Sequence, residues 1–488
     1  MTGPHLHDLA EIIDDLDAQG RLIRVRSEVD PVHDLAAIAA TRETGPRAVL
    51  FERVKGRGDP VLAGLYWSRD LLAALMRRDE KTLPQYVAAC IENWQRRPVA
   101  PIVVAEGPVS ETRQSRVDLN KLPIPTHALD DGGRYFDAGV VIAKDPDTGV
   151  RNASIQRFMV KNRNTLTVNI DAGRHLGLYL DKAARRGEVL PLTINVGVGP
   201  GLHFAAATPS EAAPPDTDEL GIASEFHGAP LELVAGTKSD VEMIAHAMYA
   251  LECEIVPGEL APEGPFAEVT GYYALCEPRP VVHVKAIHHR KKPIFHTIIS
   301  GAEVFNSVGL LGEANVLNLL QRQVPGARDV YFSHGGCGFY HAIVQLSQTR
   351  AGWAKQAIMA TFAAFPPLKM VTVVDDDVDI RNPNDVEWAM ATRLDPASGI
   401  MVIDKVFGHG LNPSFPDYVG SKVGFDATRR FPFEAVHHRA ALKSVSLEGV
   451  DIVVPEIVVA KSAKPRRGKK KDAARRKRPS RATGGSAM

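Results

Sequence analysis

The stretch AGVVIAKDPDTGVRNASIQRFMV, residues 138–160, shows most directly how the middle of the chain folds. Two runs rich in apolar residues flank Pro-Asp-Thr-Gly at 146–149. Turn-forming residues between two such runs predict a β-hairpin. The second arm of the hairpin also carries Asn152 and Arg157, so the fold and the candidate chemistry meet in one strand.

The strand pattern continues beyond this hairpin. Short apolar runs bounded by Gly or Pro occur at 165–170, 190–198, 231–236, 253–260, 267–275 and 281–288. One helix is expected at 175–187, where HLGLYLDKAARRG ends on glycine. So many short strands with one or two helices predict a partly closed antiparallel barrel over residues 105–300.

The two flanking regions have a different rhythm. Residues 1–104 mix expected helices and strands, and they begin with a helical face that carries Leu6, Leu9, Ile12, Ile13 and Leu16. From residue 301 to residue 460, helices and strands alternate as in an α/β layer. The sequence therefore predicts a mixed α/β (α+β) fold with three folded regions.

The end of the chain, residues 461–488, has a composition that cannot build a core. Twelve of residues 461–481 are Lys or Arg and one is Asp, so the rest of the chain keeps 46 basic and 57 acidic residues. Such a segment is expected to be disordered. It could touch RNA, an anionic surface or the acidic body, but we favour a solvated extension without a role in catalysis. Nucleic acid is not expected as the main partner.

Composition excludes several other classes of protein. Hydrophobic residues make up 44% and charged residues 24% of the 488 residues, which is typical of a globular protein. No stretch approaches the roughly 18–20 uncharged apolar residues of a membrane helix, and the acidic N-terminus does not look like a secretion signal. Four cysteines without CxxC spacing argue against a disulfide scaffold. We expect a cytoplasmic protein, and we expect Cys337 to be a buried small residue rather than a reactive thiol.

Three residues could form a metal site. Asn152 offers an amide oxygen, His175 an imidazole nitrogen and Glu219 a carboxylate. A mixed oxygen and nitrogen set without sulfur suits Mn²⁺ or Mg²⁺ better than zinc. Taken alone the set indicates little, because many proteins contain these residue types within seventy residues of one another.

Three other residues could handle a carboxylate and a proton. Arg157 could bind a carboxylate through two hydrogen bonds, while Glu263 and Glu268 could orient Arg157 and carry a proton. The two glutamates are five residues apart, so the Gly264-Pro265 turn must redirect the chain before both can face one cavity. Without further information, a surface salt bridge is the favoured interpretation.

The order of these motifs along the chain adds specific information. Six polar residues occur along the chain in the order Asn152, Arg157, His175, Glu219, Glu263 and Glu268. Two long motifs come later, VVDDDVDIRNPNDVEWAMATR at 373–393 and GHGLNP with GSKVGFDAT at 408–428. Together they resemble the UbiD family of reversible decarboxylases, over residues 5–460 of this chain.

The resemblance implies a cofactor and its contacts. Members of this family bind prenylated FMN in a split β-barrel domain, through its phosphate and a divalent metal, usually Mn²⁺ (or Mg²⁺), often with K⁺. On this chain Asn152, His175 and Glu219 match the metal positions, and Asp218 competes locally with Glu219. The other matched cofactor contacts are Ser154, Ile155, Gln156, Arg157 and Arg174.

The resemblance also implies an activity. Arg157, Glu263 and Glu268 match the family's catalytic positions, with Glu268 as proton donor, Arg157 binding the carboxylate and Glu263 fixing Arg157. The expected reaction is the reversible non-oxidative decarboxylation of an aromatic, heteroaromatic or α,β-unsaturated acid, with CO₂ as the other partner. A flavin prenyltransferase would supply the cofactor, and a homodimer or homohexamer is expected, with the region 301–460 contributing to assembly and to the substrate pocket.

Two other functions stay open from the sequence. A split-barrel redox flavoprotein using ordinary FMN is one, but no GxGxxG follows a predicted strand and paired glutamates have no obvious redox task. A non-catalytic scaffold is the other, but it would be expected to lose at least one of the catalytic residues. Among further polar residues, a structural role is favoured over a substrate contact for His296, His334 and His341. For the acidic run Asp375, Asp376 and Asp377, a strand end that faces solvent or caps the following helix is favoured over a second metal site.

Overall fold

The computed structural model describes residues 7–434 apart from 115, 171–172 and 210–211, together with 438–440, 442 and 446. The basic segment 461–488, predicted to be disordered, lies outside the described residues. Over the described part of the chain, none of the helices is both long enough and apolar enough to cross a membrane.

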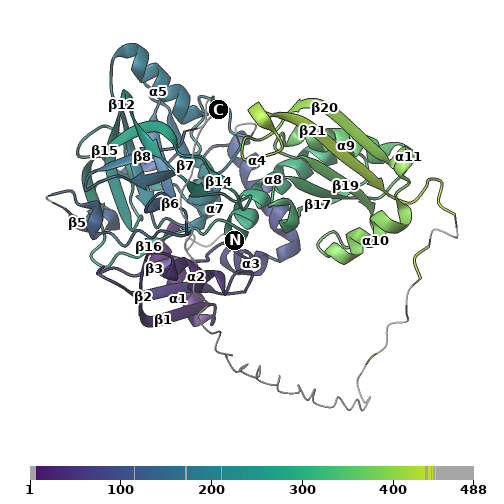
Figure 1. The fold of residues 1–488 in the computed structure, drawn as a ribbon, viewed down its shortest axis with the longest axis horizontal. Helices are drawn as coiled ribbons and strands as arrows, with labels where there is room; N and C mark the ends of the chain where they lie inside the picture. The colour runs from purple at the N-terminus through teal and green to yellow at the C-terminus, as the bar shows by residue number, and fades with distance from the viewer. Residues whose placement is uncertain are drawn as a thin grey trace, which may run out of the picture. The chain divides into compact units, whose positions relative to one another are not determined.

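The N-terminal region forms a four-stranded sheet with helices against it (Figure 1). The sheet order is β1–β2–β3–β16, with β1 (Leu22–Val29), β2 (Ala48–Val54), β3 (Val61–Ala63) and β16 (Phe295–His296). The helices of this region are α1 (Leu9–Ala18), α2 (Asp34–Ala40), α3 (Arg69–Met76) and α4 (Leu83–Arg96). Helix α4 packs mainly against two helices farther along the chain, Leu220–His227 and Ala302–Gln323, and not against this sheet. In α1, the predicted apolar face from Leu9 to Leu16 is buried, and Asp8 caps the helix by accepting the Ala10 N–H at 2.9 Å.

The central region is a β-barrel of six antiparallel strands, seen as the group of arrows labelled β6 to β15 in Figure 1. Its strands are β6 (Tyr135–Lys144), β7 (Arg151–Val160), β8 (Thr165–Val168), β9 (Leu190–Val196), β12 (Tyr249–Glu263) and β15 (Glu277–His289). The predicted hairpin is the β6–β7 pair, in which Lys144 faces Arg151. Because β12 pairs with both β9 and β15, the barrel closes instead of staying partly open.

Shorter elements complete the central region. Besides α5 (His175–Arg186), which was predicted, they are α6 (Pro200–Ala206), α7 (Leu220–His227), β4 (Ile102–Val104), β5 (Thr112–Arg113), β10 (Glu232–Val234), β11 (Met243–Ile244), β13 (Phe266–Ala267) and β14 (Tyr273–Ala274). The run 267–275, predicted as one strand, instead turns back on itself, and β13 pairs with β14. Every residue of α6 is buried, so this helix lacks the one-sided pattern by which sequence reveals a helix.

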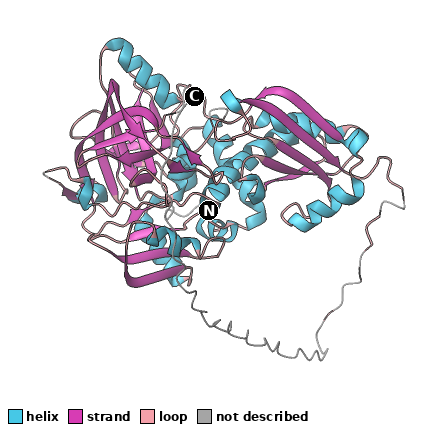
Figure 2. Cartoon of the chain, in the orientation of Figure 1, coloured by secondary structure: helices cyan, strands magenta, loops and turns pink. Residues whose placement is uncertain are grey.

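The C-terminal region is an α/β layer, with its helices and strands distinguished in Figure 2. Its sheet order is β17–β18–β19–β21–β20, with β17 (Ala327–Phe332), β18 (His341–Leu346), β19 (Met370–Asp375), β20 (Ile400–Phe407) and β21 (Val419–Ala427). The helices are α8 (Ala302–Gln323), α9 (Trp353–Ala364), α10 (Pro383–Arg393) and α11 (Pro396–Gly399). Val344 packs in one apolar cluster with α8 and α9, and its neighbour Ile343 packs in another with α10, so the sheet buries both faces.

Short 3₁₀ helices connect these elements, among them η2 (Glu80–Thr82), η3 (Pro108–Glu111), η4 (Leu119–Lys121), η5 (His334–Gly336) and η6 (Pro416–Tyr418). The described chain therefore has the mixed α/β character that the sequence predicted.

Candidate active site

Arg157 lies between two glutamates at the edge of the barrel. Its Nε donates to Glu263 Oε1 at 3.1 Å and its Nη2 to Glu263 Oε2 at 3.3 Å. Its Nη1 pairs with Glu268. The three side chains are 13%, 1% and 12% exposed respectively, so this is a largely buried triad and not the surface salt bridge that spacing alone favoured. One guanidinium thus holds two carboxylates away from bulk water.

The chain between the two glutamates makes this geometry possible. Strand β12 ends at Glu263, and Gly264 follows with φ +94°, a conformation that favours glycine. After β13 a tight turn begins at Glu268, whose N–H donates to the Tyr272 carbonyl at 2.9 Å. The reversal lets two residues that a straight strand would point to opposite faces meet on one arginine.

Two aromatic rings that the sequence reasoning missed support the triad. The Arg157 guanidinium lies over the Phe266 ring, 4.9 Å from its centroid, and the Tyr135 ring packs 4.5 Å from Phe266. Burial, with the negative charge of Glu263 nearby, raises the pKa of the Tyr135 hydroxyl, so it stays protonated and donates to the Pro265 carbonyl at 3.3 Å. The position of Phe266 between Glu263 and Glu268 was the available signal.

The loop that carries the glutamates is packed tightly against Gly132. A Cβ at Gly132 would lie 2.2 Å from the Gly264 carbonyl oxygen, whereas a Cβ at Gly133 would meet the flexible end of Met159 at 3.3 Å. We therefore expect Gly132→Ala to lower the free energy of unfolding by about 1–3 kcal/mol in urea titrations, the usual effect of overpacking against backbone. Gly133→Ala is the matched control and should lower the free energy of unfolding by a smaller amount. Equal stability of the two variants would contradict this packing argument.

Asn152 on β7, His175 at the start of α5 and Glu219, the residue before α7, form a second cluster. The Asn152 amide lies 3.2 Å from His175 Nδ1 and 2.9 Å from Glu219 Oε1, and these last two atoms are 3.2 Å apart. The carboxylate is fixed from the other side, because Glu219 Oε2 accepts the Ala153 N–H at 3.1 Å. His175 and Glu219, which lie 23 and 67 positions after Asn152 in the sequence, therefore meet Asn152 at one point.

This cluster fits a divalent cation. Three ligands on adjacent corners of an octahedron with bonds of about 2.1 Å lie about 3 Å from one another, which matches the three separations. A flip of the Asn152 side-chain amide would place its oxygen, instead of its nitrogen, towards the cation. Among the described residues, no group of three or more His, Cys, Asp or Glu side chains could hold a metal, so the amide and a further ligand would have to complete the site.

The surroundings of His175 fit a phosphate as that further ligand. His175 is the first residue of α5, and no side chain caps this helix end or places an acid in its first turn. Exposed N–H groups at a helix start attract anions. In addition, His175 Nε2 is buried and has no hydrogen-bond partner among the described residues.

The other predicted cofactor contacts lie between or beside these clusters. Ser154, Ile155 and Gln156 follow one another on β7, and Gln156 Nε2 donates to Ser154 Oγ at 3.3 Å. Arg174 is the residue that precedes α5. Asp218 points elsewhere than Glu219, because it pairs with Arg151 at 3.1 Å and accepts the Leu220 N–H at 3.0 Å.

Three histidines named from the sequence differ in their environment. His334 Nε2 contacts Asn306 Oδ1 at 3.2 Å, and His341 Nε2 contacts Thr372 Oγ1 at 2.8 Å. His296 is fully buried against the Tyr66 and His203 rings, and neither of its ring nitrogens has a hydrogen-bond partner in the described part of the chain.

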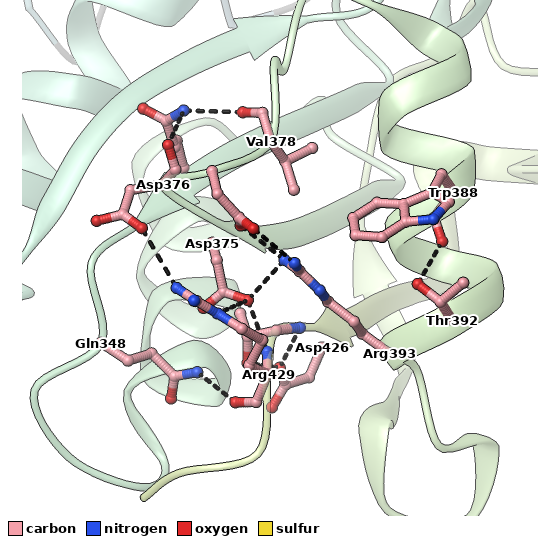
Figure 3. A network of polar contacts seen from close by, with 12 residues as sticks. Gln348, Asp375, Asp376, Val378, Trp388, Thr392, Arg393, Asp426 and Arg429 are labelled. Carbon is pink, nitrogen blue, oxygen red and sulfur yellow. Dashed lines mark hydrogen bonds and ion pairs between the residues drawn. The ribbon is translucent and has the colours of Figure 1, made fainter. Parts of the chain in front are cut away.

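The acidic run that begins at Asp375, the last residue of β19, forms an ion-pair network (Figure 3). Asp375 is buried and contacts Arg393 Nη1 at 3.0 Å and the Arg429 N–H at 2.6 Å. Asp377 pairs with Arg393 at 2.7 Å. The expectation of a solvent-facing strand end or a helix cap was wrong for Asp375, since Asn382 caps α10. Cys337 is only partly buried, where a buried residue was expected, and this burial raises the pKa of its thiol.

Comparison with known protein families gives three matches. Residues 13–91, 102–303 and 306–427 match the N-terminal, Rift-related and C-terminal domains of 3-octaprenyl-4-hydroxybenzoate carboxy-lyase, UbiD.

Two curated relatives cover most of the chain. A Rhodospirillum rubrum protein described as an uncharacterized protein in the cooM 5'region is 71% identical over 446 residues, 91% of this chain and 96% of that protein. Anhydromevalonate phosphate decarboxylase of Methanothermobacter thermautotrophicus is 36% identical over 406 residues, 83% of this chain and 93% of that enzyme.

Solved structures of UbiD-class enzymes are similar to this chain. The UbiD-class enzyme HmfF from Pelotomaculum thermopropionicum, in complex with FMN, has a TM-score of 0.86 and 38% identity, covering 91% of this chain and all of that one. Its evolved dimeric form in complex with prFMN has a TM-score of 0.82 and 37% identity, over 91% and 99% of the two chains.

Proposed function

The chain belongs to the UbiD family of carboxy-lyases, and from this premise we propose that it decarboxylates an aromatic, heteroaromatic or α,β-unsaturated carboxylic acid, reversibly and without net oxidation. The cofactor we propose is prenylated FMN held with Mn²⁺ (or Mg²⁺). The observation that carries this proposal is the buried triad in which Arg157 binds both Glu263 and Glu268.

The hydrogen bonds of Arg157 leave room for a substrate carboxylate. A guanidinium has five N–H groups. Glu263 takes those on Nε and on one side of Nη2, and Glu268 takes one on Nη1. One N–H therefore remains on each terminal nitrogen. When Glu268 takes the Nη1 hydrogen on the Cδ side, the two remaining N–H groups point the same way and can bind a carboxylate through two hydrogen bonds. In this arrangement Arg157 holds the group that leaves as CO₂.

The balance of charges in the site favours one of the two glutamates as the proton carrier. With the substrate bound, three carboxyl groups would face one guanidinium in a largely buried site, an arrangement that disfavours three negative charges. Glu263 makes two hydrogen bonds to Arg157 and is suited to fix its position. Glu268, which makes one contact through Nη1, is suited to carry the proton and to deliver it to the carbon that loses CO₂.

The cofactor would be held at the other end of β7. Asn152, His175 and Glu219 would bind the metal and, with the start of α5, the cofactor phosphate; Ser154, Ile155, Gln156 and Arg174 would line the path towards Arg157. Bound prenylated FMN would supply the electron sink that makes loss of CO₂ from an unactivated carbon feasible. The chain's own residues position the acid and move the proton.

Several expectations from the sequence and from the resemblance remain part of the proposal. They are a K⁺ ion near the phosphate, cofactor supply by a flavin prenyltransferase, a homodimer or homohexamer, a cytoplasmic location, and domain limits near residues 104 and 300. The dimeric form of HmfF supports assembly as a possibility for this fold.

A substrate panel tests the proposed reaction. The protein would be produced together with a flavin prenyltransferase, and its visible spectrum recorded. The flavin-loaded protein would then be incubated with aromatic, heteroaromatic and unsaturated acids, measuring CO₂ release and, in D₂O, exchange of the product hydrogen. We expect both signals for at least one acid. A protein that binds ordinary FMN and oxidises NADH, or one that binds no flavin, would overturn the proposal.

A further inference from the structure

A β-bulge lies opposite the catalytic arginine. On β6, Phe136 pairs with Phe158 and Gly139 pairs with Gln156, so two residues, Asp137 and Ala138, face the single residue Arg157. A bulge bends its strand and changes where nearby side chains point, and it leaves the extra residue without a ladder partner. The direction of Arg157 therefore depends on how these two residues are held.

Asp137 is held by the segment that follows β16. Its carboxylate accepts from Thr297 Oγ1 at 2.7 and 3.0 Å and from the Ile298 N–H at 2.9 Å. His127 Nε2 lies 3.0 Å from Thr297 Oγ1 and 3.4 Å from Asp137 Oδ2, so its imidazole belongs to the same group of polar contacts. Burial raises the pKa of Asp137 to about 7, although the hydrogen bonds from Ile298 and Thr297 act in the opposite direction.

Ala138 is held from α6 and from the loop that follows β3. His203 Nε2 lies 3.1 Å from the Ala138 carbonyl, and the Tyr66 hydroxyl lies 2.6 Å from His203 Nδ1. Burial lowers the pKa of His203 to about 4, so its ring is neutral and has one N–H. If the Tyr66 hydroxyl donates to Nδ1, the N–H is on Nε2 and points at Ala138.

Resting on the proposed function, we propose that Thr297 and Tyr66 are positioning residues for decarboxylation, which act by holding Asp137 and Ala138 so that Arg157 meets the substrate carboxylate. Neither of them contacts Arg157 in the bonds described above. Both come from the N-terminal sheet or the segments next to it, so the barrel's catalytic strand is aligned by another part of the chain. Small displacements matter here, since a shift of about 1 Å in a reacting group can cost on the order of 10²-fold in rate.

The test uses variants that remove one hydroxyl each from the full-length flavin-loaded protein. We expect Thr297→Val and Tyr66→Phe each to lower kcat by about tenfold, and the double variant by about a hundredfold. Thr297→Ser keeps the hydroxyl and should restore kcat. The matched control is Thr237→Val, because Thr237 Oγ1 likewise donates to a buried barrel carboxylate, Glu252, at 2.6 Å.

A second readout does not depend on activity. Hydrogen exchange of the peptide covering β7 should become faster in Thr297→Val and Tyr66→Phe, and should stay as in the parent in Thr237→Val. Thr297→Val with parental kcat and parental exchange would overturn the inference. So would an equal loss of kcat in Thr237→Val, since the effect would then be general destabilisation. If the parent acts on no acid, the proposed function fails, and the exchange comparison alone decides whether these residues hold the strand.

Discussion

Replacing Glu268 by glutamine is expected to abolish decarboxylation while the flavin stays bound. Glutamine has nearly the same shape as glutamate and can still accept a hydrogen bond from Arg157 Nη1, but it cannot donate an acidic proton to carbon. Positioned acid–base groups contribute about 10²–10⁴-fold to rates, so we expect kcat to fall at least about 10³-fold. CO₂ release and hydrogen exchange into the product, with the visible spectrum as a record of bound flavin, measure this.

The control for Glu268→Gln is Glu277→Gln. Glu277 lies directly opposite Glu263 in the β12–β15 ladder, but it is exposed and pairs with Arg279 at 2.6 Å. Its replacement removes a carboxylate charge near the site without touching Arg157, and it should leave kcat within about twofold of the parent because exposed ion pairs contribute little. A Glu268→Gln enzyme with parental turnover would show that another group supplies the proton, and Glu263 would be the next candidate.

Local patterns predicted the strands, and pairing over long distances decided how they assemble. The β6–β7 hairpin could be predicted because its turn and both arms lie within 23 consecutive residues. Closure of the barrel could not, since it depends on β12 pairing with β9 on one side and β15 on the other. Helix α7 was missed for another reason: it is buried nearly all round, and only an amphipathic helix shows its period.

The candidate residues could be predicted, but their geometry could not. Spacing alone gave no reason for Glu263 and Glu268 to share Arg157, because a straight strand would separate them. The turn at Gly264 brings them together, and its direction depends on packing against Gly132. The bulge at Asp137 left no sequence signal, since a bulge is defined by the register of two strands and not by one.

Replacing His175 by alanine is expected to release the cofactor. The imidazole lies at the point where Asn152 and Glu219 meet, and it is the first residue of a helix whose start is free of acidic side chains. Its loss would remove a metal ligand and leave Glu219 without its 3.2 Å partner. Changes around metal sites typically weaken binding by 10–100-fold, and for a direct ligand we expect a weakening of about a hundredfold or more. The flavin-to-protein ratio after gel filtration and the metal content of the same fractions measure this.

The matched control is His288→Ala, which separates cofactor loss from barrel destabilisation. His288 is a buried histidine on the barrel strand β15, and its Nε2 lies 2.8 Å from Glu252, in a network that does not include the Asn152 cluster. The His288→Ala variant should have a lower free energy of unfolding but should keep flavin and metal at parental ratios. If His175→Ala kept both, the cluster would not be the cofactor's anchor. If the parent carried flavin without a divalent metal, the three residues would have to bind the phosphate directly, which two hydrogen-bond donors beside a carboxylate could do only weakly. Cofactor retention in the presence and absence of a chelator would therefore decide whether the metal, and not the imidazole alone, ties the flavin to the barrel.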